Sequence, residues 1–115
     1  AEWKFLMGHH PIYSSGEHGN NSTMKKEFEP IIKDCGVQIY FSGHDHDQEH
    51  LDLDDYQQVI QGAGGKLRAL PTNMPHQKFG ASTLGFARIE LTPQRLDMEF
   101  FNADGKSIYQ WNQAK

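Results

Sequence analysis

Two clusters of histidine, each directly after a glycine, are the residues of this sequence best suited to chemistry. The first is "GHH" at residues 8–10 and the second is "GHDH" at residues 43–46. Neutral imidazole is a good ligand for zinc, iron, manganese and similar ions. In an extended chain His44 and His46 would leave on the same side, whereas Asp45 would point the other way and orient the loop. Two such clusters favour a metal site over scattered surface histidines.

Each cluster follows a short apolar run that predicts a buried strand. The runs are "WKFLM" at residues 3–7 and "VQIYFS" at residues 37–42, and a helical pattern covers residues 22–35 between them. A strand, a helix and a second strand make a crossover that joins two parallel strands. Because ligands bind at the carboxyl ends of parallel strands, we expect both histidine clusters at one edge of the sheet.

The predicted helix carries its own start and stop signals. Ser22 can cap its N-terminus, and Gly36 can adopt the left-handed conformation that ends a helix. Pro30 lies inside the pattern and predicts a kink or two helical pieces, with Pro30 at the first position of the second piece. Cys35 is the single cysteine, so it excludes an intrachain disulfide. It falls on the apolar face and is interpreted as a small core residue.

The second half of the sequence predicts antiparallel strands. Turn signals at residues 54–55, 92–93 and 103–105 separate runs in which apolar and polar residues alternate. Residues 63–82 form a long segment rich in glycine and proline, which is typical of a functional or mobile loop. The predicted strands are residues 50–53, 56–60, 83–92, 94–101 and 106–111. The predicted fold class is therefore α/β, with a βαβ unit followed by mostly antiparallel strands, in one domain over residues 1–115.

Length and composition narrow the classes of partner. The formal net charge of −4 gives no basic surface for nucleic acid, and no apolar run approaches the ~18 residues of a membrane-spanning helix. We therefore expect neither nucleic acid nor a membrane as partner. Hydrophobic residues make up only 37% of the 115 residues, and the sequence opens with "AEWKF" and no methionine. The low apolar content indicates long loops, or apolar surface that is covered by a partner or by missing chain. The opening suggests a piece of a longer protein.

Three blocks of the sequence resemble the calcineurin-like metallophosphoesterases, and most of all the purple acid phosphatase branch. "GHHPIYSSGEHG" and "FSGHDHDQEHL" are similar to the last two signature blocks of that family, and "GAGGKLR" at residues 62–68 is similar to the glycine-rich stretch that follows. The resemblance spans essentially the whole chain. The two histidine blocks at this spacing are a specific signal, whereas the glycine stretch alone would be weak.

The resemblance implies roles for individual histidines. His9 and His44 would bind the divalent metal of a binuclear centre, and His46 would bind the other metal, which is iron in purple enzymes. His18 would contact the phosphate ester and assist the leaving group, as a general acid does. His10 takes a position often held by an aromatic residue and is assigned no ligand role. The implied metals are iron plus zinc, manganese or a second iron, which clamp phosphate oxygens and activate a water.

The resemblance also implies the parent fold and function. The fold would be half of a four-layer α/β sandwich, and the reaction would be hydrolysis of phosphate monoesters. The family's aspartate and Asn-His blocks, which precede the blocks seen here, are not in this sequence. The chain would thus be the C-terminal half of a catalytic domain, inactive alone, with the missing N-terminal half as its partner. Secreted, vacuolar or lysosomal settings are favoured, and an uncovered sheet edge would promote self-association.

Two alternatives remain open at this point. The parent could be a phosphodiesterase or pyrophosphatase of the same superfamily. From another class, the chain could be a non-catalytic metal-binding or interaction module that retains half of the fold. An HD-type phosphohydrolase is rejected, because that motif lies on a helix and here a strand-like run precedes it.

Smaller signals have simple interpretations. The run "NNST" at residues 20–23 contains two overlapping glycosylation sequons, but a polar loop with a helix cap is favoured. His50 and His76 are interpreted as surface histidines. Lys66 and Arg68 could line an anionic pocket or be solvated loop charges. The aromatic side chains assigned to the core are Trp3, Phe41, Phe86 and Phe100.

Overall fold

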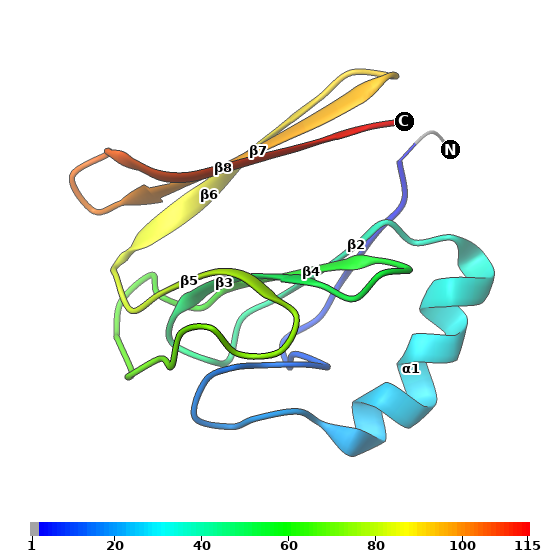
Figure 1. The fold of residues 1–115 in the computed structure, drawn as a ribbon, viewed down its shortest axis with the longest axis horizontal. Helices are drawn as coiled ribbons and strands as arrows, with labels where there is room; N and C mark the ends of the chain where they lie inside the picture. The colour runs from blue at the N-terminus through cyan, green and yellow to red at the C-terminus, as the bar shows by residue number, and fades with distance from the viewer. Residues whose placement is uncertain (1–2) are drawn as a thin grey trace.

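The protein is built in three layers, with one helix and two sheets. The computed structural model describes residues 3–115. The main sheet has the strand order β1-β2-β4-β3-β5, and the second sheet has the order β6-β7-β8. Helix α1 lies against one face of the main sheet, and the second sheet lies over the other face (Figure 1). The elements are β1 (Phe5–Met7), α1 (Ser22–Cys35), β2 (Ile39–Ser42), β3 (Gln48–Asp52), β4 (Gln57–Gln61), β5 (Gln77–Ala81), β6 (Gly85–Leu91), β7 (Arg95–Asn102) and β8 (Ser107–Ala114).

The predicted crossover is confirmed. Strands β1 and β2 are parallel neighbours, with Met7 opposite Phe41, and α1 connects them. Strand β4 also runs parallel to β2, while β3 pairs with β4 in the antiparallel direction. The hairpin turn between β3 and β4 contains Asp54 at φ 68°, a left-handed conformation that aspartate tolerates better than most residues. Because β1 and β2 are parallel, their carboxyl ends lie at the same edge of the sheet, and both histidine loops begin there.

Helix α1 differs from its prediction at the N-terminus and at the proline. Asn21, not Ser22, is the N-cap, because its side-chain oxygen accepts a hydrogen bond from the Met24 N–H at 3.0 Å. Pro30 lies inside one uninterrupted helix, so the prediction of two helical pieces is wrong. Gly36 ends the helix in the left-handed conformation at φ 65°, as predicted. The polar residue Asn21, at the end of the loop before the helix, thus serves as the N-cap.

Two hydrophobic cores lie on the two faces of the main sheet. The first is between the sheet and α1, where Ile32 meets Tyr40 and Leu51. The second is between the sheets, where Ile39 and Val59 meet residues of β7. Strand β7 presents alternate residues to this core, as a half-buried antiparallel strand does. Its fully buried side chains are Leu96, Met98 and Phe100.

Several core predictions need correction. Phe100 is fully buried, and Trp3 and Phe41 pack at the margin of the second core. Phe86 is 52% exposed because it lies on the face of β6 that does not meet the main sheet, where it stacks on the Phe101 ring. Cys35, at the last residue of α1, is also exposed rather than a core residue.

His50 is buried, so the prediction of a surface histidine is wrong, whereas His76 is exposed. His50 lies on β3 between the two sheets. Its Nδ1 is 2.8 Å from the Tyr109 hydroxyl of β8, and its Nε2 is 2.6 Å from Gln57 Oε1 of β4. Both ring nitrogens therefore have partners, which is how a buried imidazole is tolerated.

The long segment over residues 63–82 is a loop only in part. Its last residues form β5, which pairs with β3 as the outer strand of the main sheet. Within residues 3–115 no helix has both the length and the apolar character needed to cross a membrane.

Candidate metal centre

Backbone hydrogen bonds tie the two histidine loops together. The Gly8 N–H donates to the Phe41 carbonyl at 3.0 Å, which continues the ladder between β1 and β2 past the end of β1. The Gly43 N–H then donates to the His9 carbonyl at 3.1 Å. The residue after Gly43 is consequently held beside His9. The expectation that both clusters meet at one sheet edge is confirmed.

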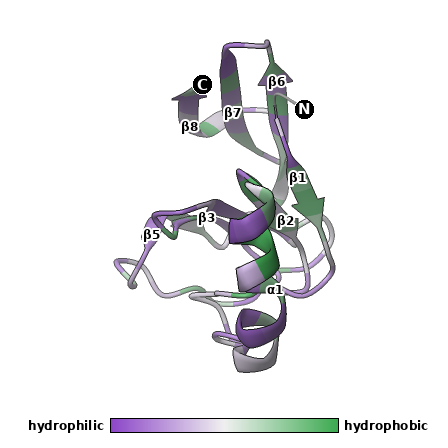
Figure 2. Ribbon diagram, turned by 90° about the vertical axis from the view of Figure 1, so that its right-hand side faces the viewer, coloured by the Kyte–Doolittle hydropathy of each residue, from purple (hydrophilic) through white to green (hydrophobic). Residues whose placement is uncertain are grey.

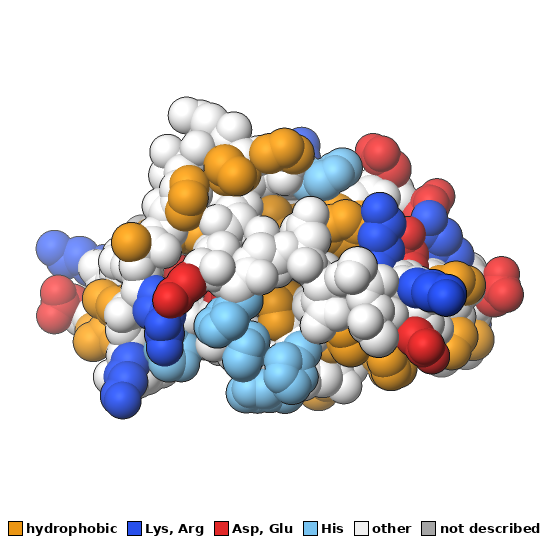
Figure 3. Space-filling model, turned by 90° about the horizontal axis from the view of Figure 1, so that it is seen from below, with side chains coloured by type: hydrophobic (Ala, Val, Ile, Leu, Met, Phe, Trp, Pro, Cys, Tyr) orange, Lys and Arg blue, Asp and Glu red, His pale blue; other side chains and the backbone are white. Residues whose placement is uncertain are grey.

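Four imidazoles converge at this edge. His9 Nε2 lies 3.1 Å from His44 Nδ1. The ring of His10 is centred 4.5 Å from that of His44, and the ring of His18 is centred 4.2 Å from it. Ligand atoms of His9, His10 and His44 all lie within 4.8 Å of one another. The histidines gather on one face of the molecule (Figure 3).

His44 reaches this position through an uncommon backbone conformation. Its φ is 66°, in the left-handed region that non-glycine residues rarely adopt. Such conformations cluster at functional sites, where the surrounding structure holds them. The chain is not extended at His44, so the prediction that the His44 and His46 side chains leave on the same side of an extended chain is wrong.

The surroundings of His44 favour its neutral form. Burial lowers the pKa of His44, and the nearby His18, His10 and His9 lower it further, while the Asp45 carboxylate acts in the opposite direction. A neutral imidazole has a free nitrogen lone pair, which is the form that binds a metal.

His18 is held by a buried carboxylate. Its Nδ1 contacts Asp45 Oδ1, and the His18 side chain is 41% exposed while that of Asp45 is 1% exposed. An ionised carboxylate can only accept hydrogen bonds, so the Nδ1 of His18 carries the proton. The Ser14 hydroxyl donates to Asp45 Oδ2. Asp45 is buried and orients His18 as well as the loop. Its carboxylate lies within 4.8 Å of ring nitrogens of His18 and His44, so the expectation that it points away from His44 is wrong.

His46 lies apart from this cluster. Its side chain is half-buried, and its carbonyl accepts a hydrogen bond from the Arg68 N–H at 3.0 Å. In the part of the chain that the structure describes, His46 belongs to no group of three or more ligand side chains with atoms within 4.8 Å of one another. Its role as a metal ligand stays a prediction.

The glycine-rich stretch packs against the backbone of the second histidine loop. The Gly62 N–H donates to the Asp47 carbonyl at 3.0 Å, and a Cβ at Gly62 would overlap the Asp45 carbonyl oxygen. Arg68 pairs with Glu17, next to His18, whereas Lys66 is exposed. Arg68 is therefore a paired loop charge beside the histidines.

Comparison with known proteins shows which family the chain resembles. The model of the calcineurin-like phosphoesterases matches residues 1–48. Purple acid phosphatase 17 of Arabidopsis thaliana is 31% identical over 100% of this chain and 36% of its own length. The tartrate-resistant acid phosphatase type 5 of Oryctolagus cuniculus is 31% identical over 94% of this chain and 36% of its own length. The chain is similar over essentially its whole length to purple acid phosphatases, and its residues 1–48 match the calcineurin-like phosphoesterases. It spans about a third of the length of these relatives.

Solved structures agree with this similarity. The structure described as GAP50, the anchor in the inner membrane complex of Plasmodium, superposes with a TM-score of 0.93 at 28% identity, over 99% of this chain and 37% of that one. A purple acid phosphatase from yellow lupin seeds superposes with a TM-score of 0.86 over 97% of this chain and 25% of that one. At 18% identity the lupin match supports the fold alone. The expected phosphoesterase fold is confirmed.

The donor set of this phosphoesterase-like chain suits a transition metal. His9 Nε2 and His44 Nδ1 lie within hydrogen-bond distance of each other, and a ring nitrogen of His10 is within 4.8 Å of both. Imidazole nitrogens suit zinc, copper, iron and nickel better than hard cations such as Mg²⁺ and Ca²⁺. His10, which the sequence assigned no ligand role, is thus placed among the donors by geometry.

Sequence reasoning also missed a group of buried acidic residues under the histidines. Asp45, Asp47 and Glu49 have carboxylate oxygens within 4.8 Å of one another, and all three side chains are buried. The available signal was the alternation of acidic residues in "DHDQE" at residues 45–49, where the strand prediction began only at residue 50.

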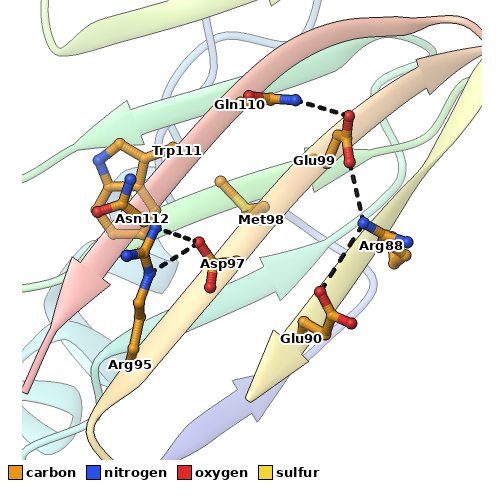
Figure 4. A pocket seen from close by; sticks show the side chains of 9 residues that line it. All are labelled: Arg88, Glu90, Arg95, Asp97, Met98, Glu99, Gln110, Trp111 and Asn112. Carbon is orange, nitrogen blue, oxygen red and sulfur yellow. Dashed lines mark hydrogen bonds and ion pairs between the residues drawn. The ribbon is translucent and has the colours of Figure 1, made fainter. Parts of the chain in front are cut away.

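A second concave surface lies on the face of the second sheet that points away from the main sheet. Its charged groups neutralise one another: Arg88 of β6 is 3.2 Å from Glu99 of β7 across the strands, and Arg95 is 2.8 Å from Asp97 within β7 (Figure 4). Such cross-strand pairs stabilise a sheet modestly. We interpret this surface as structural. Its lining residues are Arg88, Glu90, Arg95, Asp97, Met98, Glu99, Gln110, Trp111 and Asn112.

Proposed function

We propose that this chain supplies part of the active site of a metal-dependent phosphatase that hydrolyses phosphate monoesters. The observation that carries the proposal is the convergence of His9 and His44, at 3.1 Å between ring nitrogens, beside a third histidine that a buried carboxylate orients. Relatives with the name acid phosphatase support the reaction class.

In the proposed centre, His9 and His44 would hold the divalent metal and His46 would hold the other ion. The proposed pair is iron with zinc, manganese or a second iron. When bound, two such cations stabilise charge on the phosphate oxygens and make a water a better nucleophile. The chain contributes neutral imidazole donors for this purpose, held at fixed separation by the Gly43–His9 backbone bond.

His18 would act on the leaving group. Asp45 accepts from its Nδ1, so the Nε2 is free to face a substrate. In the protonated imidazole the same carboxylate stabilises the positive charge, and Nε2 can then donate a proton to the departing alcohol oxygen. Arg68 lies close by and adds positive potential, though its pairing with Glu17 reduces this.

The remainder of the catalytic domain is the proposed partner of this chain. Strands β1 and β6 are edges of their sheets, and the side chains between them form an open apolar surface. Met7, on β1, is 76% exposed, and Leu91, on β6, is also exposed. Figure 2 shows β1 as a hydrophobic strand at the edge of the molecule. An unpaired apolar edge of this kind is normally covered by another strand or chain, and we propose that an N-terminal segment of the catalytic domain covers it.

The test is a pair of histidine variants in the parent protein that contains this chain. His18→Asn should lower kcat for a phosphate monoester such as p-nitrophenyl phosphate by about 10²–10⁴-fold with little change in KM, since it removes a proton donor and not a binding group. His76→Asn is the matched control, because His76 is exposed and has a φ of 68°, which asparagine tolerates. Wild-type kcat in His18→Asn would refute the role of His18.

A second candidate function is a non-catalytic anchor or interaction module. The similarity to GAP50, at a TM-score of 0.93 and 28% identity, favours it, because that protein is described as the anchor in the inner membrane complex of Plasmodium. This candidate predicts that the folded, metal-loaded parent protein hydrolyses neither phosphate monoesters nor diesters. Turnover that His18→Asn abolishes would exclude it.

A further inference from the structure

Three carboxylates form a compact buried group beneath the histidine cluster. Asp45 and Asp47 lie on the loop before β3, and Glu49 is the second residue of β3. The exposed fractions of their side chains are 1%, 1% and 0%, and one oxygen of each lies within 4.8 Å of the other two. They use oxygen donors and point inward, whereas the histidines use nitrogen donors and lie at the surface.

Two of the three carboxylates have partners. Asp45 contacts His18 through Oδ1 and the Ser14 hydroxyl through Oδ2. Glu49 Oε1 accepts from the Ser15 N–H at 3.0 Å, and its Oε2 lies 3.3 Å from the Ser14 hydroxyl oxygen. These bonds fix the positions of both groups.

The carboxylate of Asp47 is different, because within residues 3–115 both of its oxygens are buried and neither has a hydrogen-bond partner outside the group of three carboxylates. Native proteins rarely leave a buried polar group unpaired, since its desolvation is then uncompensated. The orphaned carboxylate faces the two partnered ones. This arrangement points to a ligand in contact with Asp47 in the working protein.

The local backbone approaches this carboxylate closely. At Gly16 a Cβ would lie 2.6 Å from Asp47 Oδ2 and 3.1 Å from Asp45 Oδ2, so any other residue would press on both carboxylates. Glycine permits the "SSG" turn at residues 14–16 to approach them. The Ser14 hydroxyl oxygen lies at the same place and adds a neutral oxygen donor.

Charge balance gives the nature of the ligand. Three buried carboxylates repel one another and have one basic partner, His18, which is itself partly exposed. A positive group is needed at the centre.

We propose that Asp45, Asp47 and Glu49 form a binding site for a hard divalent cation, specifically Ca²⁺. Carboxylate and hydroxyl oxygens are the donors that Ca²⁺ prefers, and it accepts six to eight of them in flexible geometry. Mg²⁺ keeps several waters, which suits a buried cluster of side chains less well. The site adjoins the imidazole site through Asp45, which contacts His18, but the inference does not depend on the phosphatase function.

The test is calorimetric titration of the metal-stripped 115-residue chain with CaCl₂. The expected result is about one Ca²⁺ per chain for the wild type, with a rise of several degrees in melting temperature at saturating Ca²⁺. Asp47→Asn should lose both the binding heat and the rise. Glu49→Gln provides a second variant if Asp47→Asn fails to fold, as judged by far-UV circular dichroism.

Two matched controls make the outcome decisive. Asp54→Asn removes an exposed acidic residue at positive φ and should bind Ca²⁺ as the wild type does. His9→Ala removes a donor of the imidazole site and should also retain Ca²⁺ binding. Absence of binding heat in the wild type would show that the cluster binds no Ca²⁺ and would overturn the proposal. Loss of Ca²⁺ binding in His9→Ala, with retention in Asp47→Asn, would overturn it as well.

Discussion

Removal of one hydroxyl, by Tyr109→Phe, should measurably weaken the contact between the two sheets. The Tyr109 hydroxyl on β8 lies 2.8 Å from Nδ1 of His50 on β3. Nε2 of His50 lies 2.6 Å from Gln57 Oε1, and the amide of Gln57 is fixed because its Nε2 donates to Asp52 at 3.0 Å. Gln57 Oε1 can only accept, so His50 Nε2 carries the proton and Nδ1 is the acceptor for Tyr109.

The magnitude follows from what the substitution leaves behind. The Tyr109 ring stacks on Phe79 at 4.5 Å and 16°, and phenylalanine preserves that contact, so no cavity forms. The buried Nδ1 of His50 loses its donor, which costs about 1–3 kcal/mol of unfolding free energy. For a chain of this size each kcal/mol corresponds to about 4 °C in Tm. We expect Tyr109→Phe to melt about 4–12 °C below the wild type.

Urea unfolding followed by far-UV circular dichroism at pH 8 and pH 5 is the assay. The deficit should be smaller at pH 5, because the hydrogen bond from Tyr109 stabilises neutral His50 and its loss makes protonation of His50 easier. Phe86→Tyr, which adds a hydroxyl to an exposed ring of the same sheet, should stay within about 0.5 kcal/mol of the wild type. Coincident curves for wild type and Tyr109→Phe at pH 8, or an equal deficit at both pH values, would refute the reasoning.

Other sites give sharp expectations of the same kind. Burial lowers the pKa of His50, so the unfolded chain takes up the proton at a higher pH than the folded chain does. The free energy of unfolding should therefore fall below pH ~6.5 by up to about 1.4 kcal/mol per pH unit. Urea midpoints measured from pH 7 to pH 5 test this, and His50→Gln should abolish that part of the pH dependence. Asn21→Ala removes the N-cap of α1 and should cost about 1 kcal/mol in urea unfolding, whereas Ser22→Ala should cost little. Gly62→Ala would drive a Cβ into a backbone carbonyl and should lower Tm by more than 10 °C, while Gly64→Ala, with open space around it, should melt near the wild type in the same thermal scan.

The parts of the fold that the sequence predicted depend on local signals. Apolar runs that end in glycine predicted β1 and β2, and the helical spacing of apolar residues predicted α1 between them. The turn at residues 54–55 and the turn at residues 92–93 gave two hairpins that the strand pairing confirms. Each of these signals lies within a few residues of the feature it specifies. The meeting of the histidine loops then follows from the parallel direction of β1 and β2.

The parts that were missed depend on partners far along the chain. His50 is buried because Tyr109, 59 residues away, supplies a hydrogen-bond donor, and no pattern near His50 contains that information. The left-handed backbone at His44 is fixed by contacts of the neighbouring loops, and it overturned the simple alternation expected for His44 and His46. The sequence predicts a loop where β5 lies, because its glycine and neighbouring polar residues are weak strand formers. Pairing with β3 overrides that preference.

Asp45 connects the imidazole site to the acidic cluster, and this decides which variant can test each proposal. One of its oxygens faces His18 and the other faces Ser14, next to Glu49. Asp45→Asn would therefore disturb the orientation of His18 and the proposed Ca²⁺ site together. Asp47 contributes no hydrogen bond to His18 in the described structure, and its carboxylate has no hydrogen-bond partner outside the group of three carboxylates. Loss of Ca²⁺ binding in Asp47→Asn with unchanged kcat for a phosphate monoester would show that the two sites work independently, whereas a parallel loss of kcat would show that the cation reaches His18 through Asp45.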